Sequence, residues 1–278
     1  MADTVKLSPG VGYARLPPEG RSPLEPSLAK PSMPPDTKTP PLKPILHNTM
    51  QEQVYRLIRQ SLIDGQFKPG QILTIRDLAG QLGTSVMPVR EALHKLTVEQ
   101  VLDITPTRSV RVPVLTVEKF TEIGEVRILL ESHITRLAAQ RADETDIERI
   151  EAANREFLSA KASRDPTLLL RRNREFHFAI YGAAHHTTLM GLIEPLWVRC
   201  GPCMLALFED LGVEEIKKGA SSPHRAVLQA LKAGRETEAA QAIAIDIRAT
   251  IDRFRLHVET VQAIDPSSLL AKPAKERA

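Results

Sequence analysis

Four side chains that could hold a metal ion or a polar ligand occur at spacings that bring them together. Asn173 and His177 are four residues apart, so they lie on one face of a helix. The rest of that face is apolar, where polar groups need partners. His224 lies on a later helix, and Asp246 lies in the helix after it. Because the turn at 234–235 falls midway between these two residues, a helical hairpin places them at a similar height. Nitrogen and oxygen donors from three helices therefore converge.

Two other outcomes remain open for this cluster. A buried histidine is more often a hydrogen-bonded core residue than a ligand, so the cluster could be a metal-free polar pocket. It could also serve a helical metal-dependent hydrolase that uses His177, His224 and Asp246. The chain, however, has no HExxH motif to supply a general base, no phosphate-binding glycine loop and no nucleophile elbow. We therefore expect a protein that is not an enzyme.

A second set of residues is suited to contacting DNA. Gly83 separates two short amphipathic segments, 75–82 and 86–99, which predicts a helix-turn-helix. Ser85 can cap the second helix. Arg90 lies one turn into it, where an arginine can bridge O6 and N7 of guanine. The alternative for Arg90 is a surface ion pair with a carboxylate.

The segment that follows predicts a wing. Two β-prone stretches, 102–105 and 110–114, flank a Pro-Thr-Arg-Ser turn, and a short strand is expected earlier, at 71–73. Arg108 lies in the turn, so it could contact DNA from the wing. An exposed loop arginine without any function is the alternative.

One cysteine motif has the spacing of a redox site but is not expected to be redox-active. Cys200-Gly201-Pro202-Cys203 has the spacing of a thioredoxin-type redox pair, which requires a βαβ setting. Here the motif lies in a helical region, so we expect two buried, inert thiols and a kink at Gly201-Pro202. Two cysteines cannot form a disulfide framework, which agrees with a reducing compartment.

Periodicity and composition divide the chain into four parts. Residues 1–46 contain eleven of the 21 prolines, which predicts a disordered arm. Residues 47–115 are expected to form the winged helix-turn-helix domain, 116–262 an all-helical domain, and 263–278 a flexible tail. In the helical domain the apolar period predicts an antiparallel bundle. Its expected helices are at about 117–141, 144–163, 166–184, 187–209, 213–233 and 236–260. The predicted fold class is mainly α.

Composition excludes some classes of protein. Hydrophobic residues make up 42% of the chain and aromatic residues only 4%, so aliphatic residues supply the core and favour helices. No apolar run approaches the roughly 20 residues that cross a bilayer, and no secretory signal opens the chain. We therefore expect a cytoplasmic protein. The net charge of +3 is too small to indicate nucleic acid by itself.

Specific motifs resemble a known family. Pro69-Gly70, Leu78-Ala79, Leu82-Gly83 and the block Pro88-Val89-Arg90-Glu91-Ala92-Leu93 resemble the DNA-binding domain of the GntR family. The helical part resembles that family's FadR-type ligand-binding domain, called FCD. The resemblance implies a transcription regulator in which Arg76 and Ser85 contact DNA together with Arg90.

The resemblance also implies a ligand site in the helical domain. His177 and His224 match metal-binding histidines of FCD domains, whereas Asn173 replaces the usual aspartate and Asp246 the last histidine. Asparagine is a weak, neutral ligand, so the set would hold Zn²⁺, Ni²⁺ or Mn²⁺ or remain metal-free. An organic acid effector would bind beside the metal, with Arg127 as its counter-ion. The alternative for Arg127 is a surface ion pair with Glu131.

The chain departs from the family pattern at the DNA-contacting positions. Most relatives carry arginine where this chain has Val86, commonly threonine at Met87, and glycine at Ser109. Val86 and Met87 could contact thymine methyl groups in place of guanine. The docking mode therefore carries over from the family, but the operator sequence does not.

The protein is also expected to act as a symmetric dimer. One recognition helix reads too few bases, so we expect a homodimer on a palindromic operator, with the helical bundle joining the subunits. Ligand binding between the helices would change DNA affinity, and repression relieved by ligand is the favoured direction. A helical scaffold that binds other proteins would not need an arginine on a recognition helix.

Overall fold

The computed structural model describes residues 50–163, 165–210 and 221–264. The predicted N-terminal arm and nearly all of the predicted tail lie outside these residues. So does the first part of the predicted helix 213–233.

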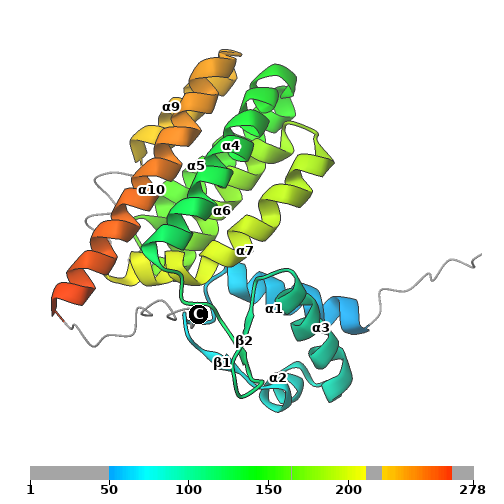
Figure 1. Ribbon diagram of the computed structural model, residues 1–278. Helices are drawn as coiled ribbons and strands as arrows, with labels where there is room; N and C mark the ends of the chain where they lie inside the picture. Colours follow the sequence, from blue (N-terminus) through cyan, green and yellow to red (C-terminus); the bar gives the residue numbers. More distant parts are fainter. Residues whose placement is uncertain (1–49, 164, 211–220, 265–278) are drawn as a thin grey trace, which may run out of the picture. The chain divides into compact units, whose positions relative to one another are not determined.

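The winged helix-turn-helix has the element order that the sequence predicts (Figure 1). Its elements are α1 (Met50–Ile63), β1 (Ile72–Leu73), α2 (Ile75–Leu82), α3 (Val86–Val98), β2 (Asp103–Ile104) and β3 (Val110–Arg111). Gly83 adopts a left-handed φ of 61° at the end of α2, which only glycine adopts without strain, and so turns the chain into α3. The strand order β1-β3-β2 is antiparallel and pairs Ile104 with Val110 below the wing.

The second part is an antiparallel bundle of helices (Figure 1). Its described helices are α4 (Val117–Arg141), α5 (Glu144–Ala160), α6 (Pro166–Gly182), α7 (Thr187–Asp210), α9 (Ser221–Lys232) and α10 (Glu236–Ile264). Local signals explain the starts of several helices. Thr116 caps α4, Asp143 forms a capping box for α5, and Asp165 caps α6 directly before Pro166.

Helices α4 and α10 form the most extensive helix–helix packing among the described residues of the bundle. Phe120 and Phe254 stack with ring centroids 4.0 Å apart. Further along, a Cβ added to Gly124 would lie 2.4 Å from Cδ1 of Ile251, so glycine permits the two helices to approach closely. Gln140 donates a hydrogen bond to Glu236 at the other end of the pair. The two helices therefore pack side by side along most of α4.

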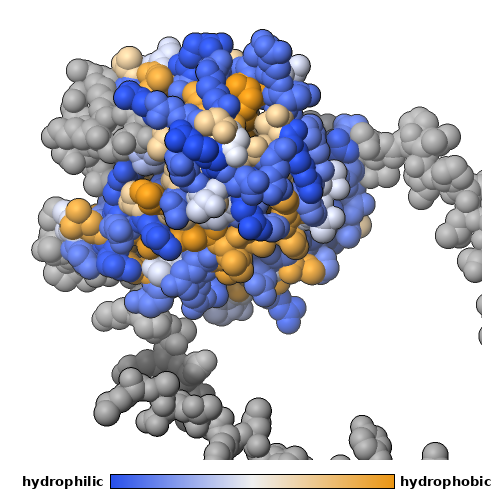
Figure 2. Space-filling view, turned by 90° about the horizontal axis from the view of Figure 1, so that it is seen from above, coloured by the Kyte–Doolittle hydropathy of each residue, from blue (hydrophilic) through white to orange (hydrophobic). Residues whose placement is uncertain are grey.

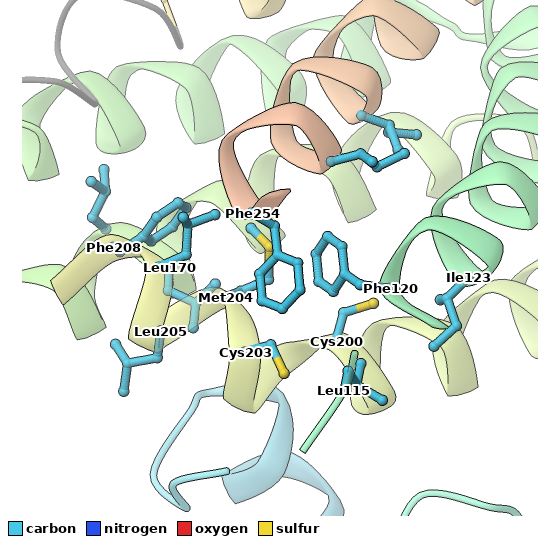
Figure 3. Close-up of a cluster of buried hydrophobic side chains, with 14 of the residues drawn as sticks. Leu115, Phe120, Ile123, Leu170, Cys200, Cys203, Met204, Leu205, Phe208 and Phe254 are labelled. Carbon is cyan, nitrogen blue, oxygen red and sulfur yellow. The ribbon is translucent and has the colours of Figure 1, made fainter. Parts of the chain in front are cut away.

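Helix α7 runs through the main apolar cluster of the bundle (Figure 3). Cys200 and Cys203 lie within this helix, both buried and both free. Burial raises the pKa of the Cys203 thiol to about 12 and also raises that of Cys200. The helical setting and these raised pKa values oppose the thioredoxin-type interpretation of the motif.

By length and composition, the segment 187–209 of α7 could cross a membrane, which the sequence analysis did not identify. In the structure 61% of its most apolar window is buried against other parts of the chain. A core helix passes the same test, and the buried side chains of α7 belong to three apolar clusters, one of which is the cluster of Figure 3.

Helix α7 also contacts the winged domain. A Cβ added to Gly201 would lie 2.4 Å from the carbonyl oxygen of Leu62 in α1. Val198 is fully buried in the apolar cluster of the winged domain. Arg174 of α6 forms a further contact, a salt bridge of 3.2 Å to Asp64 just after α1.

Candidate DNA interface and buried polar site

The recognition helix presents the predicted DNA-contacting residues to solvent. Ser85, Val86, Met87 and Arg90 are all exposed at the N-terminal end of α3, while Val89 is buried beneath them. Such an end also carries free backbone N–H groups that favour phosphate. Ser85 has the extended backbone of an N-cap residue, but its side chain makes no capping hydrogen bond. Ser85 is therefore the N-cap residue, as the sequence predicts, and its hydroxyl, which makes no capping hydrogen bond, is available to a ligand.

Arg76 and Arg108 lie on the same concave surface. A depression of about 460 Å³ is lined by the start of α2, by β1 and by the wing, and both arginines contribute to it. The wing turn is tight, because the N–H of Arg108 donates to the carbonyl of Thr105 at 2.8 Å. Arg108 adopts a left-handed φ of 61°, a conformation that glycine tolerates better than arginine. The wing thus holds a cationic side chain next to α2 at a cost in backbone strain.

Within the part of the chain that the structure describes, Arg76, Arg90 and Arg108 form no salt bridge. The alternative of a surface ion pair for Arg90 therefore has no support among these residues. Three uncompensated guanidinium groups on one domain are suited to binding phosphates and guanine.

A buried polar cluster forms in the helical domain. His177 of α6, His224 of α9 and Asp246 of α10 bring their ligand atoms within 4.8 Å of one another, and all three side chains are buried. The Nε2 atom of His177 is 3.3 Å from Oδ2 of Asp246. Phe157 and Phe176 flank the His224 ring, with centroids 4.4 and 4.1 Å away. The convergence predicted for these three residues is thus present.

A chain of hydrogen bonds orients the ring of His177. The hydroxyl of Tyr181 donates to Oε2 of Glu131 at 2.5 Å, and Nδ1 of His177 lies 2.9 Å from the same hydroxyl oxygen. Because the single hydroxyl proton is directed to Glu131, the oxygen accepts the proton of Nδ1. The other ring nitrogen of His177, Nε2, is directed toward Asp246.

The buried atoms of the cluster fit a divalent cation. Nε2 of His177 and both ring nitrogens of His224 are buried without a hydrogen-bond partner. Burial lowers the pKa of His224 to about 3, so its ring is neutral near pH 7. Burial alone would favour a neutral Asp246, but the contact with His177 and nearby positive charge lower its pKa to about 2. Two imidazoles and one carboxylate form a typical donor set for Zn²⁺, Ni²⁺ or Mn²⁺.

Asn173 lies one turn before His177 on α6 and is half-buried, on the face that the sequence analysis predicts. The other two histidines near this helix are not part of the cluster. His185 pairs with Asp146 at 2.8 Å, and Nδ1 of His186 accepts the N–H of Leu189. Both are end-of-helix residues, as the sequence predicts.

Arg127 belongs to the same buried network. Its Nε and Nη2 donate to the two carboxylate oxygens of Glu131 at 2.7 and 3.2 Å, and Glu131 is fully buried. Trp197 of α7 donates to Glu131 at 3.1 Å, and its ring lies 4.2 Å from the Arg127 guanidinium carbon. The pair with Glu131 therefore exists, but the alternative of a surface ion pair is wrong because the pair is buried.

Sequence reasoning missed three residues of this network. Glu131 was considered only as a partner of Arg127, and Tyr181 and Trp197 were not selected at all. Tyr181 follows His177 by four residues, so its position on the same face was a usable signal. No spacing rule links Trp197 to Glu131, which is on another helix.

Comparison with known proteins places both parts of the chain. Residues 50–112 match the model described as bacterial regulatory proteins, gntR family, and residues 122–249 match the FCD domain. The HTH-type transcriptional regulator McbR of Escherichia coli is 32% identical over 67% of this chain and 84% of its own. Its solved structure, E. coli McbR/YncC, covers 76% of this chain and 100% of that chain with a TM-score of 0.72 and 28% identity. The "Probable D-xylose utilization operon transcriptional repressor" of Paenarthrobacter nicotinovorans is 24% identical over 69% of this chain and 83% of its own.

Proposed function

Because this chain belongs to the GntR family of bacterial transcription regulators and carries an FCD domain, we propose that it is a ligand-responsive repressor. It binds a palindromic operator as a homodimer in the cytoplasm. A small organic acid, held in the helical domain with the help of a divalent metal, releases it. The observation that carries this proposal is the pairing of a solvent-exposed recognition helix with a buried polar site of metal-ligand chemistry.

Arg90 is the residue proposed to read guanine in the major groove, and Arg76, Ser85 and Arg108 hold the phosphate backbone. Val86 and Met87 are 41% and 53% exposed. Their apolar atoms are suited to thymine methyl groups.

Selection of genomic fragments by the purified protein tests DNA recognition. The wild type should enrich a short palindrome at moderate salt, and Arg90→Ala should lose it. Arg225→Ala, an exposed arginine on α9, is the matched control and should enrich the same fragments. Failure of the wild type to enrich any fragment, with or without candidate acids, would contradict the proposed function.

The metal is proposed to bind His177, His224 and Asp246, with Asn173 as a fourth, weaker ligand. The support is geometric: the ligand atoms of His177, His224 and Asp246 lie within 4.8 Å of one another, and all three side chains are buried. When bound, the metal would supply a Lewis-acidic position for a carboxylate oxygen of the effector. Tyr181 orients His177 through Nδ1, as outer partners of metal-binding histidines do.

Metal content gives a direct test. Protein purified without chelator should contain one equivalent of Zn²⁺, Ni²⁺ or Mn²⁺ per chain, and His177→Ala should lose it. His186→Ala is the matched control, because it removes a histidine near the same helix that lies outside the cluster. Metal-free wild-type protein that binds its effector with unchanged affinity would refute the metal's role.

The contacts of α6 and α7 with α1 supply a route for regulation. Trp197 hydrogen-bonds Glu131 in the polar network, and the next residue, Val198, packs into the winged domain. Arg174, one turn before His177, pairs with Asp64. A ligand that shifts α6 or α7 therefore acts on α1, and couplings of this kind are typically about 1–3 kcal/mol. We expect Arg174→Gln to retain operator binding and to reduce its response to the effector.

A further inference from the structure

We propose that the face formed by α4 and α10 joins two copies of this chain, with the two α4 helices antiparallel around a two-fold axis near Leu129. The inference rests on the dimer of the proposed function. It adds which surface forms the dimer and how the two copies are oriented.

The first observation is an apolar surface on two adjacent helices. Leu129 of α4 is 71% exposed, the largest value among the exposed large hydrophobic residues of the described chain. Val126 on the same helix is 46% exposed, and Ile245 of α10 is 55% exposed. Hydrophobic side chains at the surface are also visible between hydrophilic ones in Figure 2. Because α4 and α10 pack side by side, these three residues form one surface.

The second observation is a groove in the same surface. It holds about 670 Å³ and runs between α4 and α10, with Ile128, Ala240 and Ala244 among its apolar lining and with Arg136 and Arg248 as charged residues. Leu129 is one of the residues that line it. An isologous contact requires a projection and a matching recess on one surface, so that each copy fills the other. Leu129 is such a projection, and the groove is such a recess.

The third observation is the order of charges along α4. Exposed residues recur at intervals of seven, with Glu122 before Leu129 and Arg136 after it. In an antiparallel pair centred on Leu129, Glu122 lies opposite the partner's Arg136, and Glu125 lies opposite the partner's His133. A parallel pair would place Glu122 against the partner's Glu122. Charge complementarity therefore favours a second, antiparallel copy as the occupant of this face.

The test measures the dissociation constant of the full-length dimer by analytical ultracentrifugation. The wild type should sediment with twice the 30.8 kDa protomer mass. Leu129→Glu should raise the dissociation constant roughly 100-fold or more, because it places two charges in an apolar contact. Leu158→Glu on α5, which changes an exposed leucine away from α4 and α10, should leave the dimer unchanged. Far-ultraviolet circular dichroism verifies that each variant is folded.

Charge reversal tests the orientation. Glu122→Arg and Arg136→Glu should each weaken the dimer about tenfold, and the double variant should restore it to within about threefold of the wild type. Only the antiparallel arrangement predicts this rescue. Lys119→Ala controls for the loss of the salt bridge between Lys119 and Glu122 within one copy.

Operator binding in the same samples separates this inference from the proposed function. A wild-type dimer that Leu129→Glu leaves intact would overturn the α4–α10 face while operator binding persists. A double variant without rescue would overturn the antiparallel orientation. A wild-type protein that is monomeric when bound to its operator would overturn both the face and the proposed dimer. A dimer that depends on Leu129 but binds no operator supports the face and contradicts the proposed function.

Discussion

Replacing Arg127 with methionine should destabilise the protein strongly at neutral pH. The substitution removes two hydrogen bonds to Glu131, whose side chain has no exposed surface. Glu131 retains the hydrogen bonds from Tyr181 and Trp197, but it loses its only described countercharge within salt-bridge distance. Methionine preserves most of the side-chain volume, so the change isolates the charge.

The expected magnitude follows from burial. Breaking a buried ion pair by removing one partner costs about 3–5 kcal/mol, because the remaining charge is uncompensated. The matched surface pair, Arg56 with Glu52, is also spaced by four residues but is about half exposed. For Arg56→Met we expect a loss of about 0–0.5 kcal/mol. The double variant Arg127→Met/Glu131→Gln should recover most of the stability, since no buried charge remains.

Urea unfolding at pH 7, followed by circular dichroism, measures these free energies. If Arg127→Met and Arg56→Met were equally stable, the buried carboxylate of Glu131 would not be stabilised by Arg127. The assignment of this pair as a structural part of the pocket would then be refuted.

Three further outcomes follow from single residues. Burial lowers the pKa of His224 from its ordinary value near 6.5 to about 3, so between these values the unfolded chain binds a proton that the folded chain excludes. The free energy of unfolding should therefore fall as the pH falls from 6.5, by up to about 1.4 kcal/mol per pH unit. Urea unfolding in the presence of a chelator should show a smaller dependence of this free energy on pH for His224→Gln than for the wild type. An equal pH dependence of the two proteins would contradict this. Arg108→Gly should relieve the strain of the left-handed backbone, raise the free energy of unfolding by about 1 kcal/mol and so raise the melting temperature. The same change should weaken operator binding and lower the salt dependence of that binding. If a salt titration showed unchanged binding, Arg108 would not be part of the DNA interface. Gly201→Ala should destabilise the protein by about 1–3 kcal/mol, because the new Cβ would lie 2.4 Å from the carbonyl oxygen of Leu62. Gly191→Ala on the same helix is the control, because its new Cβ would meet nothing within 4 Å. In thermal melts this control should be neutral or slightly stabilising.

The sequence was sufficient for features that depend on local physics. The helix-turn-helix follows from two apolar periodicities and from Gly83, whose left-handed φ needs a residue without a side chain. The bundle helices begin and end close to their predicted limits, apart from the start of the helix predicted at 213–233, which lies outside the described residues; periodicity and caps such as Asp143 act within a few residues. The proximity of His224 and Asp246 was also predictable. The two residues are about equally far from the turn of a helical hairpin, so they lie at the same level along its axis.

Other features depend on which helices pack together, and spacing alone does not contain that information. Glu131, Tyr181 and Trp197 come from α4, α6 and α7, and their hydrogen bonds exist only once these helices are packed. Whether Arg127 and Glu131 form a surface or a buried pair was equally undetermined, because i, i+4 spacing is the same in both cases. Burial is a property of the whole packed chain. The tertiary structure therefore decided the burial and the hydrogen bonds of the pocket, whereas the sequence by itself determined which helices carry its ligands.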